Sequence, residues 1–135
     1  MGANTSGEYC VAVGSLALDA NTTANSNVAM GYNTLGANTT GDQQTAVGTY
    51  ALQANTTGVQ NSAFGSTALY SNTTADNNTA IGFQALYTNT TGTRNVAVGA
   101  YALDANSTGN YNVALGYGSL GANTASNNVV HVYNA

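Results

Sequence analysis

The side chains that could do covalent chemistry are few in this chain of 135 residues. It has one cysteine, Cys10, one histidine, His131, and one arginine, Arg94, and it has no lysine. A thiol needs a base within hydrogen-bond reach to act as a nucleophile, and His131 is the one imidazole that could serve Cys10. Whether these two side chains meet depends on the fold of the chain between them.

Acidic residues are equally sparse. Glu8, Asp19, Asp42, Asp76 and Asp104 give a net charge of −4, and charged residues make up 4% of the chain. The acids are spread along the sequence, and the G-G-x-G-x-D repeat that binds calcium in other β-rolls is absent. We therefore expect no metal site, no cofactor and no basic surface for nucleic acid. We also expect no insertion into a membrane, and residues 1–5 lack the features of a signal peptide.

The fold that places these side chains is set by a sequence repeat of seventeen residues. The consensus is N-T-T-G-x-x-N-x-A-[VILMF]-G-x-x-A-L-x-A, with seven full copies and a shortened eighth that ends at Ala135. Such a fixed period is the signature of an architecture in which each unit contacts its neighbours. We therefore treat residues 1–135 as one repeat domain. Its copies begin at Asn4, Asn21, Asn38, Asn55, Asn72, Asn89, Asn106 and Asn123.

Short β segments suit this repeat better than helices. Large apolar residues recur only at the tenth and fifteenth positions, which is too sparse for an amphipathic helical stripe. One strand is expected in the N-x-A-V stretch, as at residues 95–98, and a second around A-L-x-A, as at residues 102–105. We expect an all-β fold, a parallel β-solenoid (β-roll or β-helix) of eight 17-residue coils. With coils stacked about 4.8 Å apart, Cys10 and His131 lie roughly 34 Å apart, so one chain cannot pair them.

Two columns of large apolar residues are expected to form the core of the solenoid. The tenth position varies in shape but stays apolar, and the fifteenth is leucine in every complete copy. The alanine before the tenth position suggests a thin interior or a close contact with a neighbouring chain. The glycine after it suggests a corner with positive φ. The expected core columns are Val13, Met30, Val47, Phe64, Ile81, Val98, Leu115 and Val132 at the tenth position, and Leu18, Leu35, Leu52, Leu69, Leu86, Leu103 and Leu120 at the fifteenth.

The asparagines that open the copies admit two interpretations. Stacked at coil spacing, they would form an amide ladder in which each side chain bonds to its equivalents above and below. Seven of them also begin an N-x-[ST] sequon, the acceptor sequence for N-glycosylation, which needs an exposed side chain. We favour the ladder because it explains the same residues without a glycan.

Threonines and aromatic residues give the solenoid two candidate binding faces. The paired threonines that follow the opening asparagine form two columns, which resemble the threonine arrays of ice-binding proteins: Thr22, Thr39, Thr56, Thr73 and Thr90, then Thr23, Thr40, Thr57, Thr74 and Thr91. Adjacent residues on a strand point to opposite faces, so N-T-T offers one outward column rather than two. The aromatic residues fall at variable positions and suit lateral packing between chains or contact with cell-surface glycans. They are Tyr32, Tyr50, Tyr70, Phe83, Tyr87, Tyr101 and Tyr117.

The two ends of the chain match the repeat in a way that favours head-to-tail stacking. Met1 takes the place of the repeating leucine, and the chain stops at the thirteenth position of its last copy. A second molecule placed end to end would resume at the fifteenth position. The alternative is that this chain is a fragment of a longer fibre. The expected junction residues are Met1, Gly2, Ala3, Val132, Tyr133 and Ala135.

The centre of each copy carries a resemblance to known families. Residues 95–99, with the sequence N-V-A-V-G, and residues 112–116, with N-V-A-L-G, resemble the S-V-A-I-G motif of trimeric autotransporter adhesin heads. They also look like repeats in bacteriophage tail-fibre proteins. The resemblance implies a parallel β-roll, often trimeric, in an extracellular or virion-surface appendage. We therefore expect a non-enzymatic, self-associating protein that builds a fibre or filament, as a head-to-tail stack or a trimer, and that could also serve attachment. Ice binding through the threonine columns and glycan binding are the alternatives.

Overall fold

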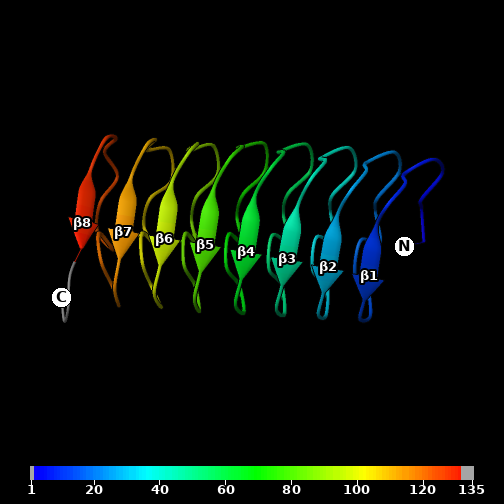
Figure 1. Cartoon of the computed structure of the whole chain (residues 1–135), viewed down its shortest axis with the longest axis horizontal. Helices are drawn as coiled ribbons and strands as arrows, with labels where there is room; N and C mark the ends of the chain where they lie inside the picture. Colours follow the sequence, from blue (N-terminus) through cyan, green and yellow to red (C-terminus); the bar gives the residue numbers. More distant parts are fainter. Residues whose placement is uncertain (1, 132–135) are drawn as a thin grey trace.

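The computed structural model describes residues 2–131, and within that range the chain forms strands and turns but no helix. All strands lie side by side in one eight-stranded sheet, in chain order, and neighbouring strands are parallel. Figure 1 shows a row of arrows that runs along an elongated stack of coils, with every arrow pointing the same way across the long axis of the stack. The predicted parallel β-solenoid is therefore confirmed. Its strands are β1 (Val11–Val13), β2 (Val28–Met30), β3 (Thr45–Val47), β4 (Ser62–Phe64), β5 (Thr79–Ile81), β6 (Val96–Val98), β7 (Val113–Leu115) and β8 (Val129–His131).

Each coil contributes one strand, and we number coils 1 to 8 by the eight opening asparagines. Backbone hydrogen bonds tie a coil to both of its neighbours and run in both directions. Leu35 N donates to Ala51 O at 3.1 Å, and Gly48 N donates back to Met30 O at 2.8 Å. Because these bonds lie along the stack rather than within a coil, no coil is stable without its neighbours.

Residues with a left-handed backbone turn the chain within each coil. The glycine at position eleven has φ of 121–137° in coils 1 to 7. A Cβ built on Gly65 would lie 2.5 Å from the Gly82 carbonyl oxygen of the next coil, so no side chain fits there. The predicted glycine corner is confirmed. Positions six, thirteen and fifteen also have positive φ, almost always without glycine.

The second strand predicted around A-L-x-A was wrong. Residues 102–105 form a turn, because Tyr101 and Leu103 have φ of 59° and 52°, which no β-strand accepts. The same left-handed pair occurs at positions thirteen and fifteen of each of the first seven coils.

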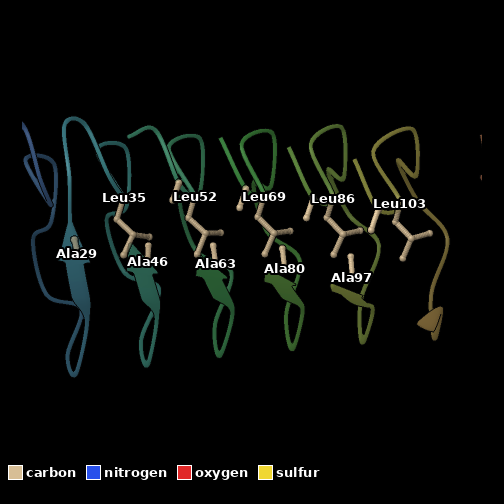
Figure 2. Packing of buried hydrophobic residues seen from close by; sticks show 14 of the residues in the cluster. Ala29, Leu35, Ala46, Leu52, Ala63, Leu69, Ala80, Leu86, Ala97 and Leu103 are labelled. Carbon is tan, nitrogen blue, oxygen red and sulfur yellow. The ribbon is translucent and has the colours of Figure 1, made fainter. Parts of the chain in front are cut away.

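The leucines at position fifteen form the centre of the core despite this backbone. Their φ values are 50–52°. A left-handed backbone costs a leucine roughly 1–2 kcal/mol, whereas full burial of its side chain stabilises by about 1.5–3 kcal/mol. Burial therefore offsets the strain. Figure 2 shows these leucines in a row beside a row of buried alanines. Leu120 is partly buried, and Leu18, Leu35, Leu52, Leu69, Leu86 and Leu103 are fully buried.

The tenth-position residues do not belong to the core, and that prediction was wrong. Successive side chains of a strand point to opposite sides, and the position-nine alanines of coils 2 to 7 are the ones fully buried. The next residue therefore faces outward. Val13, Met30, Phe64 and Ile81 are 41–53% exposed. The others, Val47, Val98 and Leu115, are half-buried.

Coil 8 is one residue shorter than the others. Asn123 Nδ2 donates to the carbonyl of Ala125, two residues on, whereas opening asparagines in earlier coils donate three residues on. Strand β8 accordingly places His131 opposite Leu115. The missing residue is one of the paired threonines, so His131 rather than Val132 continues the tenth-position column. Val132 itself lies outside the described residues.

Candidate functional site

The predicted asparagine ladder runs along the stack. From Asn21 to Asn106, each opening asparagine donates from Nδ2 to Oδ1 of the one a coil earlier, at 2.8–3.4 Å. The same Nδ2 also donates within its own coil, as Asn55 does to Gly58 O at 3.0 Å. These asparagines are fully buried, so the ladder satisfies amides that would otherwise be costly in the interior.

This ladder has two further consequences. Its six buried asparagines all begin sequons, and in the folded chain their Nδ2 atoms are enclosed and bonded rather than open to glycosylation. The ladder ends at Asn106, whose buried Oδ1 has no hydrogen-bond partner within residues 2–131. Asn123, which would supply that partner, opens the shortened coil 8, and its Nδ2 donates to Ala125 O within that coil.

A second buried amide ladder runs along position seven, and the sequence reasoning missed it. Gln44 N donates to Asn27 Oδ1 at 2.8 Å, and Asn61 N donates to Gln44 Oε1 at 3.0 Å. The side-chain amides donate to carbonyls of the next coil, as Asn61 does to Ala75 O at 2.8 Å. The signal was available, because position seven is Asn or Gln in coils 2 to 7. Its members are Asn27, Gln44, Asn61, Asn78, Asn95 and Asn112, all fully buried.

Cys10 and His131 lie at opposite ends of the sheet. Cys10 takes the position-seven place in coil 1, where its Sγ is 3.4 Å from the carbonyl oxygens of Glu8 and Ala24. His131 ends β8 and is exposed. Strands β1 and β8 are the two edges of the sheet, as Figure 1 shows, so one chain keeps the thiol and the imidazole apart, as predicted. No three His, Cys, Asp or Glu side chains among residues 2–131 form a group that could hold a metal ion.

The two threonine columns differ in their hydrogen bonds. Hydroxyls of the first column donate to the backbone of the next coil, as Thr22 Oγ1 does to Thr39 O and Thr56 Oγ1 to Thr73 O, both at 3.1 Å. These threonines are half-buried. The second column is exposed, and its hydroxyls have no hydrogen bond to any residue in the range 2–131. The stack therefore presents one rank of free threonine hydroxyls on this side, in Thr23, Thr40, Thr57, Thr74 and Thr91.

The outer face of the sheet carries a long apolar strip. We define the apolar strip as positions eight and ten of β1 to β8, which point away from the buried alanine column. Valine, methionine, phenylalanine, isoleucine and leucine predominate, with Thr45, Ser62 and Thr79 at position eight of the middle coils. No acid, lysine or arginine lies in the strip, and His131 stands at its end. The most exposed members are Val11, Val13, Met30, Phe64, Ile81 and Val129.

The aromatic residues predicted for lateral contacts form two clusters beyond the glycine corner. In the first, Tyr32 and Tyr50 meet edge to face with ring centroids 5.3 Å apart. Tyr50 meets Tyr70 in the same way at 6.3 Å, and Tyr70 stacks on Tyr87 at 5.2 Å. Burial raises the pKa of the Tyr50 hydroxyl, and its neighbour Tyr32 raises it further.

The second cluster is shorter. Phe83 meets the edge of Tyr101 at 5.3 Å, and Tyr101 meets Tyr117 at 5.6 Å. All seven predicted aromatics therefore contact another ring of the same chain. Part of each ring is covered by this packing, so the clusters stabilise neighbouring coils whatever else they contact.

No family model, no curated protein and no solved structure matches this chain. Residues 2–131 contain no helix that is long and apolar enough to cross a membrane. That part of the chain also contains no pocket. The candidate functional site is therefore a surface, and the apolar strip is its most extensive feature.

Proposed function

We propose that this chain is a structural, self-associating module of an extracellular or virion-surface fibre, and that copies pack side by side through the apolar strip. A single observation carries the proposal. The tenth-position column, which is apolar from coil 1 to coil 7, lies on the outside of the sheet, with Val13, Met30, Phe64 and Ile81 at least 41% exposed. An exposed apolar surface of this length is typical of a face that another protein covers.

The size of the strip suits association. Fully burying one large apolar side chain is worth about 1.5–3 kcal/mol, so covering one that is already half-buried gains about 1 kcal/mol. Six strip residues are at least 41% exposed, and several more are half-buried. The gain is therefore of the same order as the estimated 4–15 kcal/mol that association costs in lost freedom. Only a face that continues over many coils reaches that balance.

A second copy of the same chain is the partner that fits best. The rows of the strip recur at the coil spacing, so an identical strip matches them row for row, as self-complementary interfaces do. All five acids lie outside the strip, at positions five and sixteen of the repeat. Pairing strip against strip therefore places no carboxylate of the strip in the interface, and it removes exposed apolar side chains from water.

Axial growth belongs to the same proposal. Strands β1 and β8 each have only one neighbouring strand within the described chain, and an open strand edge is a ready template for another strand. Of the expected head-to-tail residues, Gly2 and Ala3 lie against coil 1, where both backbone N–H groups donate to Asp19. Met1, Val132, Tyr133 and Ala135 lie outside the described residues, so the junction stays a prediction.

The test is the mass of the full chain in solution, by sedimentation or light scattering, with electron microscopy of the same sample. We expect a multiple of 13.5 kDa for the wild type. Ile81→Asp puts a charge in the middle of the strip and should weaken association by about 3 kcal/mol, more than a hundredfold.

Thr57→Asp is the matched control, because Thr57 is exposed on another side of the coil and its hydroxyl makes no hydrogen bond within the described residues. It should associate like the wild type, and circular dichroism should be unchanged in both variants. A monomeric wild type, or an Ile81→Asp variant that associates normally, contradicts the proposal. Thermal hysteresis and glycan-array binding of the same samples test ice binding and glycan adhesion, which stay predictions.

A further inference from the structure

Tyr70 and Tyr87 differ from every other aromatic pair among residues 2–131. Their ring centroids are 5.2 Å apart and their planes meet at 11°, so the rings lie nearly parallel, one over the other. The other ring pairs of both clusters meet at 75–87°. Both tyrosines occupy position sixteen, in coils 4 and 5. The stacked pair therefore joins equivalent points of two successive coils.

The surroundings hold this pair in place while leaving its hydroxyls uncommitted. Ser71 N donates to Tyr87 O at 3.1 Å, which fixes the two backbones beside each other. Both side chains are half-buried, and neither hydroxyl makes a hydrogen bond to any residue in the range 2–131. Ordered, adjacent phenol rings of this kind have little freedom to move apart, which favours a reaction between them over reactions with solvent.

A line of ring contacts connects the pair to the surface. Tyr70 touches Tyr50, and Tyr50 touches Tyr32, whose side chain is 44% exposed. An oxidant that removes an electron from Tyr32 therefore creates a hole that short steps between touching rings carry to Tyr70 and Tyr87. The pair is accessible to oxidation even though its own rings are half-buried.

We propose that Tyr70 and Tyr87 are a site of oxidative cross-linking, which joins coils 4 and 5 through a dityrosine bond when the protein meets a peroxide and a haem peroxidase. Each phenol loses one electron, which passes along the line of rings through Tyr32 to the oxidised haem, and its O–H proton passes to water, so that the equivalent of one hydrogen atom leaves each tyrosine. The two radicals couple between the ring carbons beside the oxygens, forming one C–C bond. Those carbons release their hydrogens as protons, which restore both O–H groups. In total, two tyrosines and one hydrogen peroxide give one dityrosine and two waters.

The other tyrosines lack this arrangement. Tyr101 and Tyr117 meet at 75°, with the edge of one ring toward the face of the other. Tyr111 is engaged by Arg94, whose Nη1 donates to its hydroxyl at 2.9 Å and whose guanidinium lies 5.4 Å from its ring centroid. Tyr117 is therefore a suitable control position, because it is tyrosine in a ring cluster that is not stacked.

The cross-link would tie the middle of the stack together. Contacts between coils are otherwise non-covalent, and a bond between residues 70 and 87 closes one coil into a covalent ring, which restricts the unfolded chain. We expect the oxidised protein to unfold at a higher temperature than the untreated one. The inference does not depend on association between copies, because both tyrosines belong to one chain.

The experiment treats the full folded chain with hydrogen peroxide and a haem peroxidase. Dityrosine fluorescence should appear, intact mass should fall by two hydrogen atoms, and the product should run as a single chain on a denaturing gel. Peptide mapping should recover the segments that contain Tyr70 and Tyr87 joined together. Tyr87→Phe should reduce the intramolecular product to background, and Tyr117→Phe should leave it at the wild-type level.

Several results would overturn the inference. Three of them are no dityrosine in the folded wild type, an equal yield in Tyr87→Phe, and products that join only separate chains. Wild-type protein oxidised in denaturant gives the reference yield for random coupling. A dityrosine yield in the folded state that is no higher than this reference would overturn the inference as well. Circular dichroism of both phenylalanine variants before oxidation checks that the fold is retained.

Discussion

The two apolar columns of the stack lie on opposite sides of the chain and obey different rules. At position fifteen every complete coil has leucine, and six of the seven are fully buried. At position ten the residue changes from coil to coil among valine, methionine, phenylalanine, isoleucine and leucine, and four of these residues are 41–53% exposed. The inner column is enclosed on all sides by equivalent residues of successive coils, and this enclosure accepts one side-chain shape. Of the two apolar columns, the one with a uniform residue identity is therefore the core.

The largest effect should come from truncating the inner column. Leu69→Ala removes a fully buried side chain, and the replaced residue keeps the left-handed backbone, with φ of 51° in the wild type. We expect a loss of about 2–5 kcal/mol in the free energy of unfolding. Phe64→Ala, in the outer column of the same coil, should cost less than half as much. Urea denaturation at protein concentrations low enough to suppress association measures both, and equal losses would remove the distinction between the columns.

The polar part of the interior should be almost as sensitive. Asn55→Ala leaves Gly58 O, Asn38 Oδ1 and Asn72 Nδ2 each short of one hydrogen bond inside the stack. The expected cost is about 2–3 kcal/mol. Thr57→Ala changes an exposed hydroxyl two residues away and should cost less than about 0.5 kcal/mol. If Asn55→Ala were tolerated as well as Thr57→Ala, the ladder would be a consequence of the fold rather than a support for it.

A smaller effect, of opposite sign, is expected at the turns. Thr67 is β-branched and has φ of 56°, a conformation that glycine adopts without strain and that Gly118 already provides in coil 7. Thr67→Gly should stabilise by about 0.5–1 kcal/mol, because relief of strain exceeds the entropy cost of glycine. Thr49→Gly, at the neighbouring position twelve where φ is not positive, should destabilise by a similar amount. Thermal unfolding of the two variants should shift the midpoint in opposite directions.

The smallest effect is expected in the pH dependence of stability at Tyr50, which is half-buried. Burial raises the pKa of Tyr50 above its ordinary value of 10.0. A raised pKa means that the folded state holds the phenol proton more tightly than the unfolded state, so this contribution is complete below pH 10.0 and is lost as pH rises through the folded value. Denaturant titrations above pH 10.0 should show a shallower fall in stability for Tyr50→Phe than for wild type. Well below pH 10.0, the wild-type and Tyr50→Phe curves should run parallel.

Much of the fold could be predicted because its strongest signals recur in register. Leucine at position fifteen, glycine at position eleven and asparagine at position one each repeat from coil to coil, and stacking at that period places each set in a column. The asparagine ladder could be predicted from the hydrogen bonding of stacked amides, and the glycine corner from the positive φ that glycine accepts. The second ladder at position seven carries the same kind of signal, with Gln44 in place of asparagine.

The errors have separate physical causes. In the N-x-A-V strand the smaller residue, alanine, points inward and the larger one outward, the reverse of the usual distribution of size in a protein core. Large residues such as Phe64 were therefore assigned to the wrong side. The turn at Leu103 was read as a strand because leucine gives no warning of a left-handed backbone. The shift that moves His131 into the outer column depends on one missing residue, which only hydrogen bonding locates.

Adjacent coils meet through the same backbone hydrogen bonds, buried columns and amide ladders. A segment of seventeen residues is therefore the unit by which the stack could be lengthened. Duplication of any seventeen-residue segment between coils 2 and 7 would add one row to the core, one rung to each amide ladder and one step to the apolar strip, without altering any existing contact. The rod could therefore lengthen or shorten over generations in whole coils, and the apolar strip would lengthen or shorten with it. A change whose length is not a multiple of seventeen has to be absorbed in a turn, as the missing residue of coil 8 is, or it shifts the columns that follow it.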